Sequence, residues 1–149
     1  HSIHNAGVGG SSPPIATNLL FIMDIAILLS GIAAGAILFH TSIVAPTVFK
    51  VLGPPEAKVF LRTVFPKLFN MLAALGFIML ILFFIGMGNI YVAITTISLP
   101  FICGRLIPAT NRARDEGDTK MFRNLHTVSV VLTIIVLLSN LAWIVKYFT

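Results

Sequence analysis

The chain has 149 residues, of which 57% are hydrophobic and only 10% are charged, and its formal net charge is +5. So few charged groups cannot coat a water-soluble globule of this size, whereas lipid accepts an apolar surface. The composition therefore excludes a soluble domain and predicts an integral membrane protein. The positive charges flank the apolar segments, so anionic lipid headgroups explain them better than a nucleic-acid partner.

Four apolar segments predict an all-α bundle of four transmembrane helices, because a bilayer core of about 30 Å needs about 20 helical residues. The predicted helices cover residues 18–49, 67–88, 90–108 and 123–148, and residues 1–17 form an extramembrane tail before the domain 18–149. The first helix is too long for one straight span. Pro46 near its end predicts a kink, since proline lacks the backbone donor and clashes with the preceding turn.

The connection after the first helix contains its own helical pattern. Pro54 and Pro55 suit a helix start, and apolar residues follow at the spacing of one helical face: Ala57, Phe60, Leu61, Val64 and Phe65. The pattern predicts a short amphipathic helix that lies in the headgroup layer and ends at Pro66. Ordinary packing of this segment against the bundle is the alternative.

The distribution of lysine and arginine predicts the orientation in the membrane. Residues 50–67 and 105–123 hold most of the basic residues, whereas residues 86–89 between the second and third helices are uncharged. Short basic loops stay on the cytoplasmic, matrix or stromal side. Both basic loops are therefore predicted inside and both termini outside, in a bacterial inner membrane or an organellar inner membrane.

The amino-terminal tail, residues 1–17, is rich in Gly, Ser and Pro. Such a tail orders itself poorly alone, so we expect a partner subunit to contact it. A free terminal His1, with His4 nearby, is a copper-binding candidate, against the simpler interpretation of an exposed tail. Cys103 is the single cysteine, which excludes an internal disulfide and favours a packing role.

Asp24 is the one acidic residue in a predicted span. A carboxylate at that depth needs donors, protonation or water, and antiparallel packing places Thr95, Thr96 and Asn140 at a comparable depth. The functional interpretation is an ion or proton site. The structural interpretation, which the pattern favours, is a buried hydrogen-bond cluster or a carboxylate at headgroup level.

The fourth helix carries a polar stripe, because His126, Ser129, Thr133 and Asn140 follow helical spacing. That face is predicted to look inward, where partners exist. His126 and His40 of the first helix should lie at similar depth, so they are candidates to hold a haem or copper between them, or to form simple hydrogen bonds.

Gly31 and Gly35 on the first helix form a small-xxx-small pattern that lets membrane helices approach closely. The pattern predicts tight packing, within the bundle or against a neighbouring subunit.

Two segments carry a resemblance to a known family. The first is the run Phe49-Lys50-Val51-Leu52 followed by residues 64–69, which read VFPKLF, and the second is the run 107–115 followed by Phe122, Arg123, His126 and Ser129. Together they resemble the corresponding motifs of the transmembrane protein 205-like family, over about residues 25–145. The matching positions on the inner side are Pro66, Arg105, Pro108, Arg123, His126 and Ser129.

The resemblance implies a four-helix membrane domain of largely unknown activity, whose members have been linked to platinum-drug resistance. This sequence lacks the tryptophan often found in that family's first helix, and His40 matches no family position. The chain shows no nucleophile beside a base and no cysteine cluster with metal-ligand spacing, so no enzyme activity is predicted.

The sequence favours a noncatalytic accessory subunit that packs against larger partners in a membrane complex, respiratory or photosynthetic, with bound lipids. The first alternative is a small transporter or metal-resistance protein that uses Asp24 and the polar stripe. The second alternative is a haem-binding electron-transfer subunit.

Overall fold

The computed structural model describes the backbone of residues 14–149 and the side chains of residues 25–149. The predictions for His1, His4 and the partner contacts of the tail lie outside this part of the chain. So does the prediction for the Asp24 side chain. The helix of the first span already begins at Pro14, earlier than the predicted start at residue 18.

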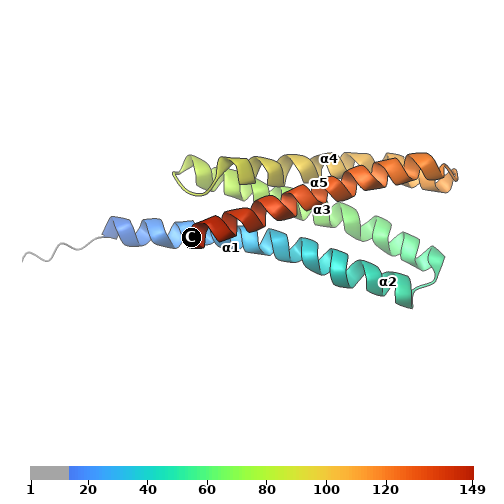
Figure 1. Cartoon of the computed structure of the whole chain (residues 1–149), viewed down its shortest axis with the longest axis horizontal. Helices are drawn as coiled ribbons and strands as arrows, with labels where there is room; N and C mark the ends of the chain where they lie inside the picture. Colours follow the sequence, from blue (N-terminus) through green and yellow to red (C-terminus); the bar gives the residue numbers. More distant parts are fainter. Residues whose placement is uncertain (1–13) are drawn as a thin grey trace, which may run out of the picture.

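The described residues form helices without any strand, as Figure 1 shows. The elements are α1 (Pro14–Phe39), the π-helix η1 (His40–Val44), α2 (Ala45–Val51), α3 (Pro54–Phe84), α4 (Ile90–Asp115) and α5 (Thr119–Phe148). Four helical stretches are long and apolar enough to cross a membrane, namely Ile25–Val51, α3, α4 and α5. The predicted all-α bundle of four transmembrane helices is confirmed.

Pro46 deforms the first span as the sequence predicts, although the helix widens instead of breaking. The backbone N–H of Ala45 bonds to the carbonyl oxygen of His40, five residues earlier, which is the π-helical pattern. Proline at position 46 cannot donate to the carbonyl of Ser42, and its ring crowds that turn. A π-helical turn before the proline relieves the crowding, so α1, η1 and α2 follow one another as one continuous helical stretch, as Figure 1 shows.

The amphipathic segment after Gly53 is the first part of α3 and not a separate helix. It starts at Pro54, as the prolines predict, but it continues through Pro66 to Phe84. Proline inside a helix costs one hydrogen bond. Leu68 and Phe69, which follow Lys67, are buried in the core, and their burial favours the continuous helix. Ala57 is buried and Phe60 is 39% exposed, so only part of the predicted apolar face packs against the bundle.

The third and fourth spans are longer than the apolar segments suggested. α4 continues past Pro108 to Asp115, and α5 begins at Thr119, so only residues 116–118 join them. The Asp118 carboxylate accepts a hydrogen bond from the backbone N–H of Met121 and caps α5. At the opposite end, Asn89 caps α4 in the same way.

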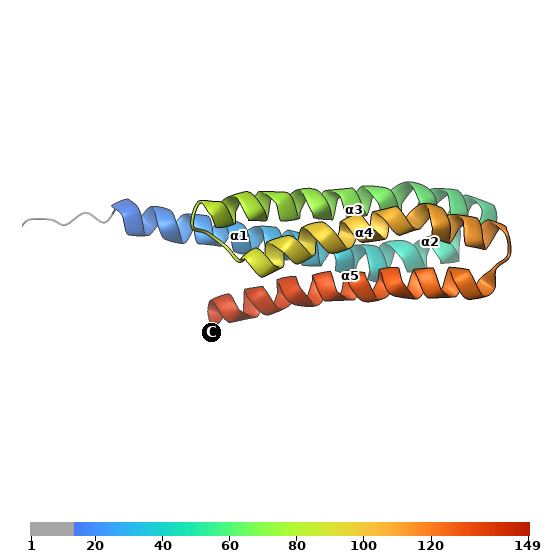
Figure 2. The same ribbon diagram turned by 90° about the horizontal axis from the view of Figure 1, so that it is seen from above.

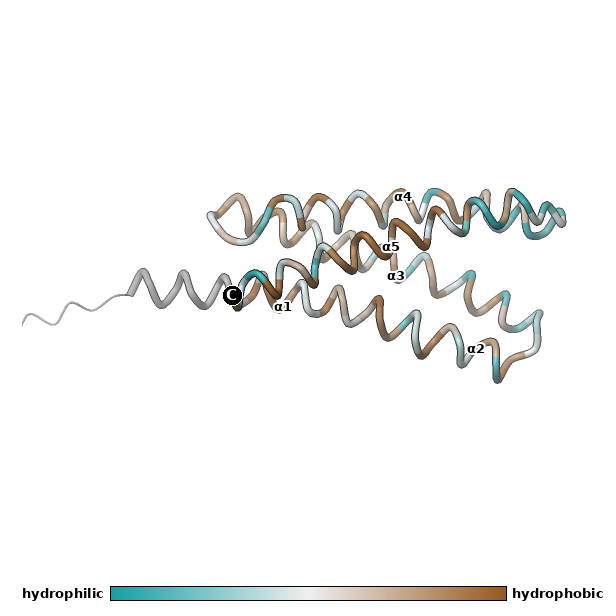
Figure 3. The backbone as a smooth tube through the Cα atoms, in the orientation of Figure 1, coloured by the Kyte–Doolittle hydropathy of each residue, from teal (hydrophilic) through white to brown (hydrophobic). Residues whose placement is uncertain are grey.

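Each of the four spans packs against particular neighbours. Long contacts join α3 to α4 and α4 to α5, while α1 packs mainly on α5 and less on α3. Figures 1 and 2 show that the α2–α3 and α4–α5 connections lie at one end of the bundle, and the α3–α4 hairpin lies at the other. The hydrophilic residues gather at the first of these ends, above all around the α4–α5 connection, as Figure 3 shows. We call it the charged end.

Two groups of apolar side chains fill the interior. The larger, which we call the central cluster, contains Ala33, Ile37, Leu68, Phe69, Leu72, Cys103 and Val136. The second, the hairpin-side cluster, contains Met79, Val92 and Ala93, with Leu29, Leu80 and Trp143 packed against them. The buried polar residues of the described chain are Ser30, His40, Thr96 and Asn140.

Candidate functional site

Three of the four residues predicted for a buried polar site come together between α4 and α5. Asn140 donates from Nδ2 to Oγ1 of Thr96 over 2.9 Å and to the carbonyl oxygen of Val136 over 2.9 Å. Both side chains are fully buried. One residue away on each helix, the hydroxyls of Thr95 and Ser139 lie 3.1 Å apart. The structure thus joins Thr96 to Asn140 and places Thr95 beside Ser139, while the side chain of Asp24 is not among those described.

Each of the four spans contributes one buried small or polar residue that lies, along its helix, between residues of the two clusters. Ser30 of α1, Gly76 of α3, Thr96 of α4 and Asn140 of α5 are all buried. Ser30 follows Leu29 of the hairpin-side cluster and precedes Ala33 of the central cluster. Asn140 lies between Val136 of the central cluster and Trp143 of the hairpin-side cluster. We call these four residues the polar layer.

Gly76 is the residue of this layer that the sequence analysis missed. A Cβ atom added there would lie 2.7 Å from the backbone nitrogen of Ile97 and 2.7 Å from the carbonyl carbon of Thr96. Only glycine lets the α4 backbone approach α3 this closely. A glycine in the middle of the apolar run 67–88 was the available signal.

Gly31 and Gly35 do not serve helix packing within the described bundle. A Cβ atom at either position would meet no atom within 4 Å, and both residues are exposed. The predicted packing face of α1 is therefore not an internal one. The buried face of α1 carries other small residues, namely Ala26, Ser30, Ala33 and Ala34.

An apolar barrier separates the polar layer from the charged end. Ile37, Leu72 and Val136 of the central cluster are each at most 2% exposed. On the far side of this barrier, Ser129 and Thr133 donate to carbonyl groups of α5 itself, and the Cys103 thiol lies 3.6 Å from the carbonyl oxygen of Ser129. Along α5, the buried side chain of Val136 therefore lies between Asn140 and the hydroxyls of Ser129 and Thr133.

The predicted inward stripe of the fourth helix is correct for Asn140 and wrong for His126. His126 is exposed and stacks on Phe122 of the same helix, with ring centroids 5.7 Å apart. His126 lies about one turn before Ser129, nearer the charged end. A histidine side chain there is readily solvated. The Arg114 guanidinium covers the same Phe122 ring at 5.1 Å.

His40 and His126 have different surroundings. His40 is 4% exposed and packs edge-on against Phe65 of α3, with ring centroids 4.7 Å apart. Its Nε2 atom has no hydrogen-bond partner among the described residues. Within residues 25–149, no group of three or more His, Cys, Asp or Glu side chains is placed to hold a metal ion.

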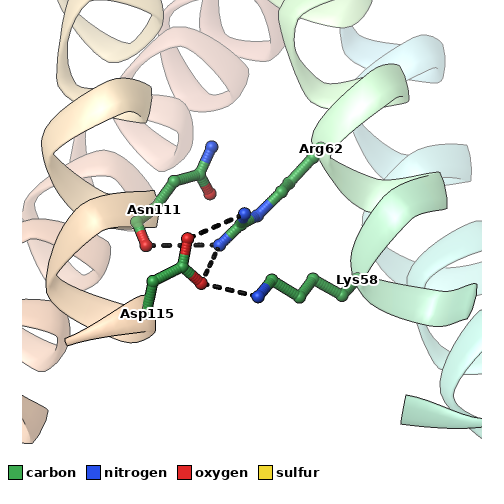
Figure 4. A network of polar contacts seen from close by, with 4 residues as sticks. All are labelled: Lys58, Arg62, Asn111 and Asp115. Carbon is green, nitrogen blue, oxygen red and sulfur yellow. Dashed lines mark hydrogen bonds and ion pairs between the residues drawn. The ribbon is translucent and has the colours of Figure 1, made fainter. Parts of the chain in front are cut away.

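At the charged end, one carboxylate joins α3 to α4, as Figure 4 shows. Asp115 accepts two hydrogen bonds from Arg62, of 2.7 and 3.0 Å, and lies 2.6 Å from the Lys58 ammonium. Arg62 also donates to the carbonyl oxygen of Asn111 over 3.2 Å. The two basic connections therefore meet at one end of the bundle. Sequence reasoning placed these charges together but did not predict this contact.

The remaining inner-side motif residues lie near this end without forming one site. Arg105 and Arg123 are exposed on α4 and α5, and Pro108 is exposed within α4. Pro66 is half-buried within α3. The Ser129 hydroxyl donates to the carbonyl oxygen of Leu125 over 3.1 Å. The two prolines lie inside helices that continue past them, and the two arginines are exposed.

The surface of the α2–α3 corner has two open apolar grooves. The larger, of about 680 Å³, runs along α3 between Pro55 and Lys67, and the smaller, of about 310 Å³, lies between α2 and Phe60 of α3. Leu52 and Phe60 line both grooves.

Comparison with known proteins gives one result that bears on this arrangement. Residues 28–147 match the model of a family described as a domain of unknown function, DUF4149, and so the match covers all four spans. No curated protein and no solved structure matches the chain. The chain belongs to the DUF4149 family.

Proposed function

We propose that this DUF4149 protein is a noncatalytic accessory subunit that packs against other proteins within a membrane complex. The observation that carries the proposal is the position of Gly31 and Gly35. They lie on the outward face of α1, in one stripe with the exposed side chains of Leu28, Ile32 and Leu38. We call this stripe the α1 outer face.

Two exposed glycines one turn apart destabilise α1, and neither glycine makes a close contact with another helix of the bundle. Each costs about 0.5–1 kcal/mol relative to alanine. Between membrane helices, in contrast, small residues allow the close backbone contact that drives association. Gly76 shows this use inside the bundle, where α4 contacts it directly. The α1 outer face has the same chemistry without an internal partner, which supports a helix of another subunit as its partner.

The transporter alternative has one observation in its favour. Ser30 Oγ and Asn140 Oδ1 are buried without a hydrogen-bond partner among the described residues, as an ion site requires. However, the barrier of Ile37, Leu72 and Val136 closes the polar layer toward the charged end. A flux assay in liposomes tests this alternative, because transport would need this barrier to open.

Site-specific photo-crosslinking in native membranes tests the subunit proposal. A benzoylphenylalanine at Ile32, on the α1 outer face, should give a crosslink to a different polypeptide. The same group at Ile78 of α3, which has the same exposed fraction of 44%, is the control.

A bulky side chain at a glycine position of the α1 outer face should abolish the crosslink from Ile32. Gly35→Ile blocks close helix approach, whereas Ala74→Ile on the exposed surface of α3 should leave the crosslink unchanged. Crosslinks to lipid alone from Ile32, or equal protein crosslinks from both probe positions, would count against the proposal.

A further inference from the structure

Two apolar grooves adjoin each other at the α2–α3 corner. The larger, of about 680 Å³, runs along α3 from Pro55 to Lys67, and the smaller, of about 310 Å³, lies between α2 and α3. Leu52 and Phe60 line both of them, and we call the two together the corner groove. Both volumes fall in the range of about 300–1,000 Å³ that is typical of small-molecule sites.

The corner groove lies where the hydrocarbon core of a bilayer meets the headgroups. Lys67 is the first charged residue of α3 counted from the α3–α4 hairpin, because residues 68–84 carry no charge. Between Phe84 and Lys67 the helix rises about 25 Å, which is close to the thickness of the bilayer core, about 30 Å. Residues 55–67 therefore extend from the edge of the core into the headgroup layer. Val59 is 67% exposed there, and an exposed apolar surface outside the hydrocarbon marks a binding site.

Lys67 is the unpaired cation of the corner groove. The two other basic residues of α3, Lys58 and Arg62, both contact Asp115 of α4. Lys67 is exposed, and no carboxylate within residues 25–149 forms an ion pair with it. Its charge is therefore available to a bound anion.

The other polar groups that line the larger groove are engaged elsewhere. The Thr63 hydroxyl donates to the carbonyl oxygen of Val59 over 2.9 Å. Glu56 lies about 16 Å from Lys67 along the helix. Its carboxylate covers Gly53 at the start of α3, since a Cβ atom added to Gly53 would lie 2.6 Å from Glu56 Oε2. A carboxylate at this position complements the helix dipole, so Lys67 is left to set the sign of the ligand charge.

We propose that the corner groove binds an anionic phospholipid, whose phosphate pairs with the Lys67 ammonium and whose glycerol and adjoining acyl segment contact Val64 and Phe60. Side chains of an α-helix lean toward its N-terminus, so the stem of Lys67 reaches from the edge of the core toward the lipid phosphates. A phospholipid carries an anion and an apolar chain in one molecule at this level of the membrane. An acidic protein segment would bring several carboxylates to a groove with one free cation, whereas a phospholipid brings one phosphate.

Native mass spectrometry of the full chain in detergent tests the charged part of the site. The probes are phosphatidylglycerol and phosphatidylcholine with identical acyl chains. The wild type should retain phosphatidylglycerol severalfold more strongly, and Lys67→Gln should lose this preference, whereas Lys67→Arg should keep it. Lys120→Gln, at an exposed position in the first turn of α5, removes the same charge and should leave the preference unchanged.

The apolar part of the site has its own variant. Phe60→Ala should weaken the retention of phosphatidylglycerol severalfold, whereas Phe101→Ala, on the exposed surface of α4, should not change it. Equal retention of the two lipids by the wild type, or equal effects of Lys67→Gln and Lys120→Gln, would overturn the proposal. So would a benzoylphenylalanine at Val59 that crosslinks in native membranes to protein and not to lipid, because a protein segment would then occupy the groove.

Discussion

Asn140 of α5 donates a hydrogen bond of 2.9 Å to Thr96 of α4, and no solvent reaches either side chain. Hydrogen bonds between membrane helices average about 0.6 kcal/mol in double-mutant cycles, because partners are also found in the unfolded state within the membrane. This bond joins two helices that already share a long contact. The hydrogen bond therefore contributes little to the free energy of unfolding, but it fixes which residues of α4 and α5 lie side by side.

A double-mutant cycle measures that contribution. Asn140→Leu and Thr96→Val should each destabilise the protein, and their coupling free energy should be about 0.6 kcal/mol. The cycle is needed because Asn140→Leu also removes the bond from Asn140 to the Val136 carbonyl, so that variant alone does not isolate the bond to Thr96. Unfolding equilibria in mixed detergent give the four free energies. Strictly additive effects would show that the hydrogen bond contributes nothing.

Gly76→Ala should destabilise the bundle by about 1–3 kcal/mol, since the added methyl group meets the α4 backbone and not a flexible side chain. Gly104→Ala on α4 is the matched control, because a Cβ atom there meets nothing within 4 Å. The control should be neutral or slightly stabilising. Thermal unfolding in detergent compares the two variants, and equal Tm values would contradict the close approach of α3 and α4.

Arg62→Gln should lower Tm by at most a few degrees, because the contact with Asp115 is partly exposed to solvent and surface ion pairs contribute little. Lys120→Gln, an exposed substitution in the first turn of α5, should change Tm less. High salt should narrow the difference between Arg62→Gln and the wild type. A difference that persists unchanged in high salt would show that Arg62 acts mainly through packing.

The two histidines should respond differently to truncation. His40→Ala removes a buried ring that packs on Phe65, and it should cost about 1–3 kcal/mol in the free energy of unfolding. His126→Ala removes an exposed ring and should stay within about 0.5 kcal/mol of the wild type. The absorption spectrum of the same preparations tests the haem alternative. A haem band that disappears with His126→Ala would favour the electron-transfer alternative.

The sequence predicted the spans well because a stretch of about 20 predominantly apolar residues has few explanations other than a membrane helix. The comparable depth of Thr96 and Asn140, which now hydrogen-bond to each other, could be read from the sequence because short connections force neighbouring helices to be antiparallel. The helix ends were harder to predict. Residues 109–115 are polar, yet they continue α4, because polar side chains are compatible with a helix that extends beyond the bilayer core.

Contacts between spans were the least predictable part. Whether a glycine faces a neighbouring helix or the outside depends on how its helix is rotated about its own axis. The spacing of apolar residues and the composition do not determine that rotation. Gly31 and Gly35 formed the more conspicuous pattern, but they face outward, while the unremarked Gly76 forms the close contact. The Arg62–Asp115 contact likewise depends on how far α3 and α4 extend beyond the apolar core.

The mass of the assembly that contains this chain tests the subunit proposal most directly. The protein, tagged at the carboxyl terminus and extracted from native membranes in a mild detergent, should migrate with other polypeptides in fixed proportion. Gly35→Ile should release it from that assembly without unfolding it. A particle made of this chain alone, unchanged by Gly35→Ile, would contradict the account.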